Sequence, residues 1–384
     1  MGEKLAAGNK LRLLYIIPTL NTGGAEKYVL EIASKLSTQG HQTYVVSLGP
    51  IDEEFLDLHG SRNTQITQFQ TKKVISIRSL WVIYRLFKYL KEERIDLVHL
   101  NLIGADILGG IAALLAGCPF ISTQHNTRSW RYSRKLRKRL AKLLHRSVMH
   151  FSSAIIAPTL SVKQYLRETT QIPLCKIRVI YHGIDLNKFA PRIKKIRRRV
   201  TIGSIGRFEQ RKGQMYIVDA LPKILSKLKK YKIEVLFAGE GVYQHKVKSR
   251  AVQLDLLNYV KFLGTLKDMP DFLSKIHILA HAATEGEAFC YAALEGLATG
   301  KAVVITNTDG IPEFIKDHHN GILIPIRSSE AVANAIIELI ENQREYDIIS
   351  KNAANSVRPF FSKDRTIDET LQLYTETLRK EKTD

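Results

Sequence analysis

Cysteine is scarce in this chain. Its 384 residues include three cysteines, Cys118, Cys175 and Cys290, which lie far apart and form neither a CxxC pair nor a Cys/His spacing suited to a metal. The sequence therefore excludes a disulfide framework and predicts no metal site. We interpret the three thiols as reduced residues that pack in the interior.

Long hydrophobic runs are also missing. The nearest candidate for a membrane span, residues 107–121, has fifteen residues, is rich in Gly and Ala, and contains Pro119. A spanning helix needs about 20 apolar residues, so we predict a buried helix that leads into a strand. The first ten residues have neither the apolar core nor the cleavage site of a secretory signal. Together these observations predict a cytoplasmic protein.

Negative charge is absent from one part of the chain. No carboxylate lies between Asp106 and Glu168, whereas residues 128–146 contain nine basic residues. Residues 1–199 carry 33 Lys and Arg against 13 Asp and Glu, a net charge of +20, and residues 200–384 carry 25 against 24, a net charge of +1. Because a solvated face normally mixes both signs, this excess predicts an anionic partner for the first half.

The basic segment has the periodicity of a helix. One predicted face carries Leu136, Leu140, Leu143, Leu144 and Ser147, and we expect it to pack on its own domain. The cations on the other faces favour an anionic membrane surface, bound through residues 128–146. Since no zinc finger or aromatic RNA-binding motif accompanies the charge, we predict no nucleic-acid partner.

Short β-branched runs alternate with segments of helical length along the whole chain. In the first half they cover residues 12–20, 41–48, 96–101, 119–125, 154–159 and 177–183. In the second half they cover residues 200–206, 233–241, 260–264, 277–283, 302–307 and 320–325. This alternation is typical of α/β proteins with doubly wound parallel sheets. A basic linker, NKFAPRIKKIRRR, separates the two series and places the domain border near residue 186.

Two loops at predicted strand ends have features of anion sites, because ligands bind at the carboxyl edge of such sheets. Gly23 and Gly24 allow close backbone approach and precede a helix N-terminus. This turn does not match GxGxxG, so the dinucleotide fingerprint is excluded. The stretch RFEQRKG offers Arg207 and Lys212 directly after a predicted strand. Taken alone, that pair is better explained by a solvated surface turn.

A pair of glutamates follows a later apolar strand. In TEGEAFCYAALEGLATG, Glu287 lies in a loop and Glu295 on the next predicted helix, seven residues intervening. This spacing corresponds to about two helical turns, so the two carboxylates lie too far apart to share a proton. It suits two carboxylates that contact the two ends of an extended ligand. Glu285 is a second candidate for the first glutamate of this pair, but the seven-residue separation from Glu295 favours Glu287.

The motifs of this chain occur in the same order as those of the retaining glycosyltransferases of family four, which the chain therefore resembles. In sequence order they are GGAE, a strand-terminal His, HGID, GRF…RKG, AGEG, FLG, E-x7-E and IPE…NGILI. The resemblance covers nearly the whole chain. It implies the GT-B fold, with two Rossmann-like parallel-sheet domains facing a central cleft. The implied domains are residues 1–185 for the acceptor, 186–364 for the donor, and 365–384 as a helix that crosses back.

The resemblance also implies roles for individual residues. Arg207 and Lys212 correspond to the pair that holds the donor diphosphate, Glu287 to the contact with the donor sugar, and Glu295 to the contact with the ribose. Backbone amides that face the donor are implied at Phe289, Cys290 and Tyr291. His125, at the end of a predicted strand, matches a histidine near the reacting carbon, and we expect His182 to support the inter-domain turn. The family often reads EGFG where this chain has Ala288 and Cys290, so the choice of sugar does not transfer.

The resulting prediction is a retaining, metal-independent glycosyltransferase at the cytoplasmic face of a membrane. Its donor is a nucleotide-diphospho-sugar, no cofactor is expected, and no DxD triplet occurs. The predicted acceptor is a lipid-linked glycan or a precursor of a cell-surface polysaccharide such as lipopolysaccharide or capsule. Two alternatives stay open: another enzyme on the same fold, such as a nucleotide-sugar epimerase or a phosphorylase, and a non-catalytic binder of anionic lipid or polymer.

Overall fold

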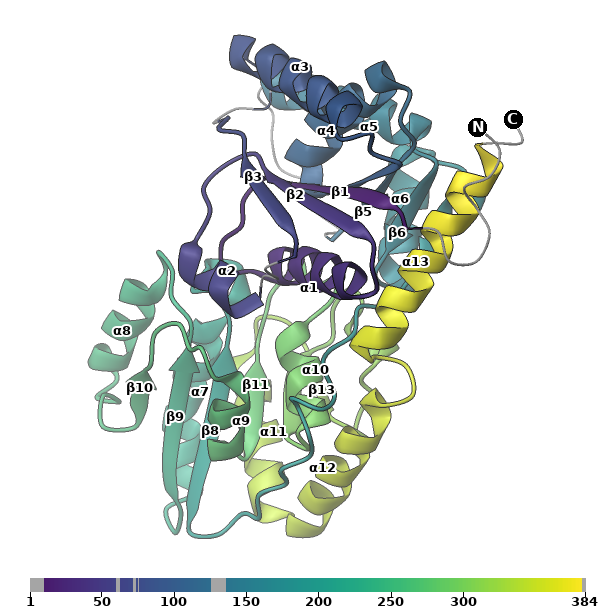
Figure 1. The fold of residues 1–384 in the computed structure, drawn as a ribbon. Helices are drawn as coiled ribbons and strands as arrows, with labels where there is room; N and C mark the ends of the chain where they lie inside the picture. Colours follow the sequence, from purple (N-terminus) through teal and green to yellow (C-terminus); the bar gives the residue numbers. More distant parts are fainter. Residues whose placement is uncertain (1–9, 60–62, 72–73, 75, 126–135, 382–384) are drawn as a thin grey trace. The chain divides into compact units, whose positions relative to one another are not determined.

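The chain forms two compact units, unit 1 (Met1–His182 with Arg365–Asp384) and unit 2 (Gly183–Asp364), drawn as ribbons in Figure 1. Each unit is described by itself. The computed structural model describes residues 10–59, 63–71, 74, 76–125 and 136–381.

Unit 1 is built on a seven-stranded sheet within the described residues, and all neighbouring strands are parallel. The spatial order of its strands is β3-β2-β1-β4-β5-β6-β7. The strands are β1 (Arg12–Ile17), β2 (Gln42–Ser47), β3 (Gln65–Gln68), β4 (Leu97–Asn101), β5 (Phe120–Thr123), β6 (Ala154–Ala157) and β7 (Ile177–Val179).

Helices cover both faces of this sheet. Alternate residues of β1 point to opposite faces: Leu13 and Tyr15 join a core with α1 and α13, and Leu14 and Ile16 join a core with α3, α4 and α5. Burial on both faces explains why β1 is apolar along most of its length. The helices are α1 (Gly24–Thr38), α2 (Glu53–His59), α3 (Ile77–Glu92), α4 (Leu102–Ala116), α5 (Leu136–Phe151), α6 (Leu160–Thr170) and α13 (Lys363–Lys380).

Unit 2 contains a six-stranded parallel sheet in the order β10-β9-β8-β11-β12-β13, again counted over the described part of the chain. Helices α7, α8 and α11 contribute to the core on one face, and α9 and α10 contact the other. The strands are β8 (Arg199–Ile205), β9 (Lys232–Ala238), β10 (Val260–Phe262), β11 (Ile278–His281), β12 (Ala302–Thr306) and β13 (Ile322–Ile324). The helices are α7 (Gln214–Lys227), α8 (Gln244–Gln253), α9 (Met269–Lys275), α10 (Tyr291–Ala298), α11 (Ser329–Glu341) and α12 (Gln343–Val357).

The predicted α/β class with two parallel sheets is confirmed, and each predicted strand is present. The sequence did not predict one strand, β3. β3 has the sequence QITQ, lies at the edge of its sheet and buries none of its four residues completely, so it lacks the apolar run of its neighbours. Residues 107–121 form the end of a buried helix followed by a strand, as expected.

The predicted packing face of α5 is only partly right. Leu144 packs against the core, but Leu140 is 46% exposed and Leu143 61% exposed, whereas Ala141, His145 and Val148 are buried. Asp106 of α4 is a fully buried carboxylate that accepts hydrogen bonds from the Ser122 hydroxyl at 2.6 Å and the Gln124 amide at 2.9 Å, and a buried carboxylate needs such partners. Its Oδ2 lies 2.9 Å from Nε2 of His145. Helix α5 turns its histidine inward and leaves two leucines at the surface.

The thiols are also distributed differently from the expectation. Cys290 is buried and Cys118 half-buried, but Cys175 is exposed, so it is not a packing residue.

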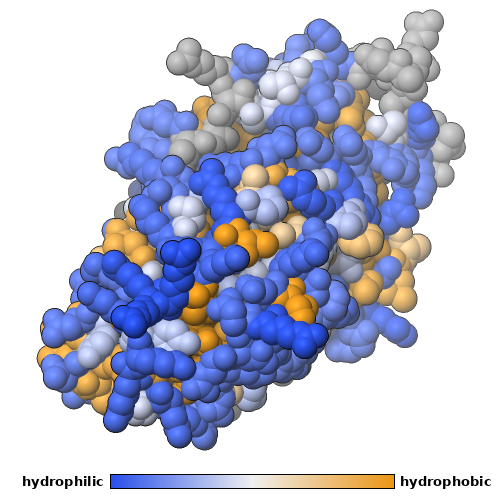
Figure 2. Space-filling model, turned by 90° about the horizontal axis from the view of Figure 1, so that it is seen from below, coloured by the Kyte–Doolittle hydropathy of each residue, from blue (hydrophilic) through white to orange (hydrophobic). Residues whose placement is uncertain are grey.

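The surface is largely hydrophilic in the view of Figure 2, where hydrophobic residues reach the surface only as small separate patches. Among the described residues, no helix is both long enough and apolar enough to cross a membrane.

Candidate functional site

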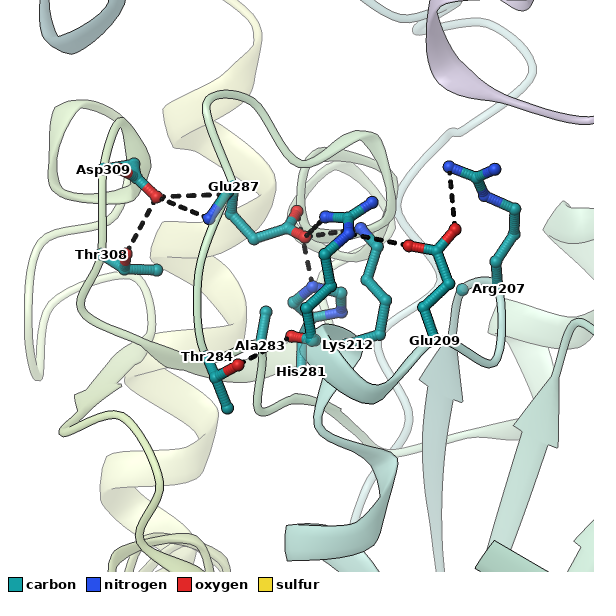
Figure 3. A network of polar contacts seen from close by, with 12 residues as sticks. Arg207, Glu209, Lys212, His281, Ala283, Thr284, Glu287, Thr308 and Asp309 are labelled. Carbon is teal, nitrogen blue, oxygen red and sulfur yellow. Dashed lines mark hydrogen bonds and ion pairs between the residues drawn. The ribbon is translucent and has the colours of Figure 1, made fainter. Parts of the chain in front are cut away.

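Two loops meet at the carboxyl edge of the unit 2 sheet. They follow β8 and β11, which are paired in parallel, and cover residues 206–213 and 282–290. Figure 3 shows polar side chains from both loops pointing toward one another. The structure therefore brings Lys212 and Glu287, far apart in the sequence, into contact.

Gly213 determines how closely the loops approach. Its φ is +71°, and a Cβ there would lie 1.8 Å from the carbonyl oxygen of Ala282. Two residues further along this second loop, the amide of Thr284 donates to the carbonyl of Arg211 at 2.8 Å. A residue with a side chain would force the two backbones apart, which explains the glycine that ends RFEQRKG.

Glu287 is the buried centre of this contact. Its side chain is 3% exposed, and Oε1 lies 2.5 Å from Nζ of Lys212 and 3.6 Å from Nη1 of Arg211. Burial alone raises the pKa of the Glu287 carboxyl. The nearby charges of Lys212 and His281 outweigh burial and hold this pKa well below its usual range. Glu287 is therefore an anion at neutral pH.

Arg207 lies at the exposed rim of the site. Its side chain is 58% exposed, and Nη2 is 3.2 Å from Oε1 of Glu209. The other oxygen of Glu209 accepts from Nε of Arg211 at 2.7 Å. Glu209 thus links the exposed arginine to the cations around Glu287, as Figure 3 shows. Because surface pairs of this kind are weak, Arg207 can turn toward a bound anion at small cost.

Asp309 holds the glutamate loop from the other side. Its Oδ2 accepts from the amides of Gly286 and Glu287 at 3.1 and 3.2 Å, and from the Thr308 hydroxyl at 3.0 Å. Gly286 has a φ of +74°, a value that glycine adopts without strain. The backbone on which Glu287 stands is therefore fixed by a side chain from the loop after β12.

His281, the last residue of β11, lies beneath Glu287. It is buried, and its Nε2 is 3.6 Å from Oε2 of the carboxylate. Burial lowers the pKa of the His281 imidazole, but Cys290 and Glu287 more than offset this and raise it to about 10. The imidazole is therefore charged at neutral pH.

The remaining predicted donor residues surround the start of α10. Cys290 is its N-cap and Tyr291 its first residue. The Phe289 ring meets Tyr291 edge-on at a centroid distance of 5.3 Å and Phe314 at 5.7 Å. Glu295 is buried within the helix. The first glutamate thus lies in a loop and the second on a helix.

Gly23 and Gly24 belong to unit 1, at the N-terminus of α1. Gly23 is extended, with φ −175°, a conformation open to any residue. A Cβ there would lie 2.2 Å from Oε2 of Glu26, so the glycine leaves room for a carboxylate from the first helical turn. This anion lies at the helix end, where negative charge is stabilised.

His125 also belongs to unit 1, among buried aromatic rings. Its Nε2 is 3.0 Å from Oδ1 of Asn101, and its ring meets Tyr28 edge-on at 5.3 Å. The His182 ring lies 4.3 Å from that of Tyr28. Burial lowers the pKa of His125 to about 4, although Asp106 partly opposes this shift. His125 is consequently neutral at neutral pH.

The predicted membrane-binding segment is only partly described. Residues 128–135 lie outside the described residues. Within α5, Arg139 and Lys142 are exposed next to Leu140 and Leu143, and Arg146 bonds to Gln171. The described surface of α5 therefore mixes cations with exposed leucines.

Sequence reasoning missed three residues of the unit 2 site: Arg211, His281 and Asp309. Arg211 stands in the same RFEQRKG stretch but matches neither position of the family pair. Asp309 follows a predicted strand in TNTDG, a turn signal at the carboxyl edge. His281 carried no signal, because it ends an apolar strand and only the fold places it under Glu287.

Comparison with solved structures defines the class of the fold. A glycosyltransferase from Rickettsia africae matches with a TM-score of 0.80 at 23% identity, covering 96% of this chain and 99% of that chain. Anabaena HepE, solved with UDP and glucose, matches with a TM-score of 0.82 at 22% identity, covering 95% and 100%. The chain therefore has the two-domain GT-B fold of glycosyltransferases.

Sequence comparison then gives the family. A model of Glycosyltransferase Family 4 matches residues 22–188, and a model of the group 1 glycosyl transferases matches residues 187–356. The two matches together span most of the sequence, and the chain belongs to this family of glycosyltransferases.

Two curated relatives illustrate the family. The UDP-Gal:alpha-D-GlcNAc-diphosphoundecaprenol alpha-1,3-galactosyltransferase of Escherichia coli is 25% identical over 79% of this chain and 81% of its own length. The phosphatidyl-myo-inositol mannosyltransferase of Mycobacterium tuberculosis is 23% identical over 86% and 88%.

Proposed function

We propose that this glycosyltransferase moves a sugar from a nucleoside diphosphate to an acceptor hydroxyl with retention of anomeric configuration. The observation that carries the proposal is the contact between Lys212 and the buried Glu287, at 2.5 Å, with Arg207 exposed beside it. Cations and an ionised carboxylate at one sheet edge suit a ligand that is anionic at one end and rich in hydroxyls at the other.

The chemistry assigned to these residues is electrostatic. As the bond between the anomeric carbon and the phosphate oxygen breaks, negative charge grows on the departing diphosphate. Arg207 and Lys212 stabilise this charge, helped by the N-termini of α7 and α10, so transfer needs no metal ion. The Glu287 carboxylate accepts hydrogen bonds from the donor sugar, and Glu295 contacts the nucleotide ribose.

The transfer step balances without an added base. The acceptor hydroxyl oxygen bonds to the anomeric carbon on the face from which the phosphate leaves, and a phosphate oxygen takes the hydroxyl proton. The products are the glycoside and the free nucleoside diphosphate. Unit 1 takes the acceptor, where His125, held neutral by burial, serves as a hydrogen-bonding group rather than a cation.

A panel of nucleotide sugars tests this function. We expect one of them to release nucleoside diphosphate on incubation, and the same nucleoside diphosphate to bind in calorimetric titrations. Release of an altered sugar instead identifies an epimerase, and phosphate-dependent release of sugar phosphate identifies a phosphorylase. If no nucleoside diphosphate binds, the proposal is wrong and a non-catalytic binder becomes the better explanation.

We further propose that the acceptor is lipid-linked and that the enzyme works at the cytoplasmic face of a membrane. Helix α5 supplies the exposed cations Arg139 and Lys142 beside Leu140 and Leu143. Cations that meet phosphate head groups and apolar side chains that enter the bilayer boundary are the two features of peripheral binding. The two curated relatives support a lipid acceptor, since their names specify a diphosphoundecaprenol and a phosphatidylinositol.

Vesicle co-sedimentation tests the docking. Each cation near an anionic bilayer contributes about 1 kcal/mol, so Arg139→Gln with Lys142→Gln should weaken binding to anionic vesicles at least tenfold. Raising the salt from 0.1 to 1 M shortens the Debye length from about 10 to about 3 Å and should weaken wild-type binding as well. A control with Lys227→Gln and Lys229→Gln, exposed residues of unit 2, removes the same charge and should bind normally. Equal binding to neutral vesicles, or equal loss in the control, contradicts docking through α5.

A further inference from the structure

A buried cluster of three potential metal ligands lies beneath the donor site. His281 ends β11, Glu287 lies in the loop that follows, and Cys290 caps α10, and all three residues are buried. One imidazole nitrogen, one carboxylate oxygen and the thiol sulfur lie within 4.8 Å of one another. The cluster differs from the sequence-based prediction of no metal site, because residues spaced H-x5-E-x2-C converge only in the fold.

The cluster contains a polar atom without a hydrogen bond. Among the described residues, Nε2 of the buried His281 has no hydrogen-bond partner. The charged imidazole is therefore held by an ion pair with Glu287 rather than by a hydrogen bond. Nε2 points toward Oε2 of Glu287 at 3.6 Å, beyond hydrogen-bond distance. The other carboxylate oxygen, Oε1, is engaged by Lys212 at 2.5 Å. Oε2 of Glu287 therefore faces His281, while Oε1 remains paired with Lys212.

We propose that His281, Glu287 and Cys290 bind a transition-metal ion of the zinc class through Nε2, Oε2 and Sγ. Nitrogen, carboxylate oxygen and thiolate sulfur are the donors that Zn²⁺ takes in proteins, with three protein ligands and one open position as a common arrangement. Bonds of about 2.0–2.3 Å in tetrahedral geometry place the ligand atoms about 3.3–3.8 Å apart. The three side chains reach that spacing by moving about 1 Å, a change that side-chain torsions can supply.

The charge of the cluster also suits a buried cation. Zn²⁺ takes its ligands as neutral imidazole, carboxylate and thiolate, so its binding releases the imidazole proton, and the thiol proton where one is present. The divalent ion thus replaces one or two protons, and the net charge of the buried cluster rises by at most one unit. Lys212 remains paired with Oε1, so no charge is left alone in the interior.

A second set of candidate ligands provides an internal control. His318, Glu338 and Glu345 also lie close enough together to hold an ion. His318 is exposed and its Nδ1 is already 2.8 Å from Oε1 of Glu345. This set has no sulfur, and it offers two carboxylates, which suit harder cations than zinc. A soft metal therefore favours the buried set.

Cobalt binding gives a direct test, because a thiolate ligand to Co²⁺ produces an intense charge-transfer band in the near ultraviolet. Metal-stripped full-length protein titrated with CoCl₂ should show this band at one equivalent, and ZnCl₂ should displace it. Cys290→Ser should abolish the band, while Cys175→Ser, at an exposed thiol, should retain it. Absence of the band in wild type, or its persistence in Cys290→Ser, overturns the proposal.

Zinc affinity measured against a chromophoric chelator completes the test. We expect His281→Gln and Cys290→Ser each to weaken zinc binding more than tenfold, and His318→Gln to leave it unchanged. Circular dichroism checks that each variant is folded. If His281→Gln does not fold, the zinc affinity of Cys290→Ser decides the test. Loss of affinity in His318→Gln alone assigns the metal to the exposed set and excludes the buried one.

One consequence rests on the proposed function. A metal that holds Oε2 fixes the carboxylate assigned to the donor sugar, so zinc should inhibit transfer in competition with the nucleotide sugar. The cobalt spectrum needs neither donor nor acceptor, whereas the nucleotide-sugar panel is run on metal-stripped protein. Absence of the cobalt band therefore contradicts the metal site without affecting the proposed function. If no nucleotide sugar releases its nucleoside diphosphate, the proposed function is contradicted without affecting the metal site.

Discussion

The pKa values of histidines in the interiors of the two units are shifted in opposite directions. In unit 1, burial lowers the pKa of His125 to about 4 and that of His99 to about 3. In unit 2, the pKa of His281 is raised to about 10 although burial opposes the rise. The difference lies in the neighbours. His99 bonds to the hydroxyls of Tyr374 and Thr123, whereas His281 faces the thiol of Cys290 and the carboxylate of Glu287.

The comparison shows that burial alone does not decide the charge of a side chain. Desolvation disfavours the charged form in both units, and only an anion at close range reverses it. Unit 1 therefore presents a neutral, aromatic site, and unit 2 a site of compensated charges. A neutral site suits hydrogen bonding to hydroxyls, and a charged one suits a diphosphate.

Removing one charge from unit 2 should have the largest effect. Lys212→Met keeps the apolar stem but leaves Glu287 with Arg211 and His281 only. We expect the free energy of unfolding to fall by about 3 kcal/mol, the lower end of the range for breaking a buried pair. Turnover should also fall by about 10²-fold, as for one lost charge at a developing anion.

Arg207→Met is the matched control, because Arg207 is exposed and pairs only weakly. Its turnover should fall by a similar factor while its stability stays within about 0.5 kcal/mol of wild type. Chemical denaturation and initial-rate kinetics measure both quantities. Wild-type turnover in either variant at saturating donor contradicts the phosphate assignment.

Acid should weaken unit 1 more than unit 2. A histidine whose folded pKa lies below its unfolded value contributes stability above pH 6.5 and loses it as the pH falls toward the folded pKa. A fall from 6.5 to about 4 makes this loss about 2 kcal/mol per histidine between pH 7 and 5. In unit 1 the pKa values of His41, His99, His125 and His182 are all lowered, whereas in unit 2 that of His277 is lowered and those of His281 and His318 are raised.

Hydrogen exchange, corrected for its intrinsic pH dependence, resolves the two units. Amides of β4 and β5 should lose more protection on acidification than those of β11 and β12. His125→Gln removes one titrating group, so its loss of protection in unit 1 should be about 2 kcal/mol smaller. Equal loss in both units contradicts the assignment of neutral histidines to unit 1.

The two glutamates should differ by a smaller factor. Glu287→Gln should lower transfer at least tenfold with little change in nucleoside diphosphate affinity, because it removes a charged acceptor from the site proposed for the donor sugar. Glu295→Gln should mainly weaken nucleotide binding. Calorimetric titration of the nucleoside diphosphate into both variants, beside their turnover, measures the division. Equal losses of affinity show that the two roles are not separate.

The sequence by itself determined the architecture. Alternating apolar runs and helix-length segments predicted two parallel sheets, because buried strands need continuous hydrophobic stretches. Short strands at a sheet edge carry no such signal, and β3 was therefore missed. The resemblance to the family-four glycosyltransferases assigned Arg207, Lys212 and Glu287 to one donor site, in loops that follow predicted strands.

Only the tertiary structure decided which neighbours each polar residue has. Helix α5 packs through Ala141, His145 and Val148 rather than through Leu140 and Leu143, and His145 there contacts the buried Asp106, a long-range partner that periodicity does not reveal. Arg211, Asp309 and His281 join Glu287 through contacts across 22 or more residues or through strand direction, which local sequence does not encode. Charge on a buried side chain depends on distances of a few ångströms between such segments, and these distances exist only once the chain has folded.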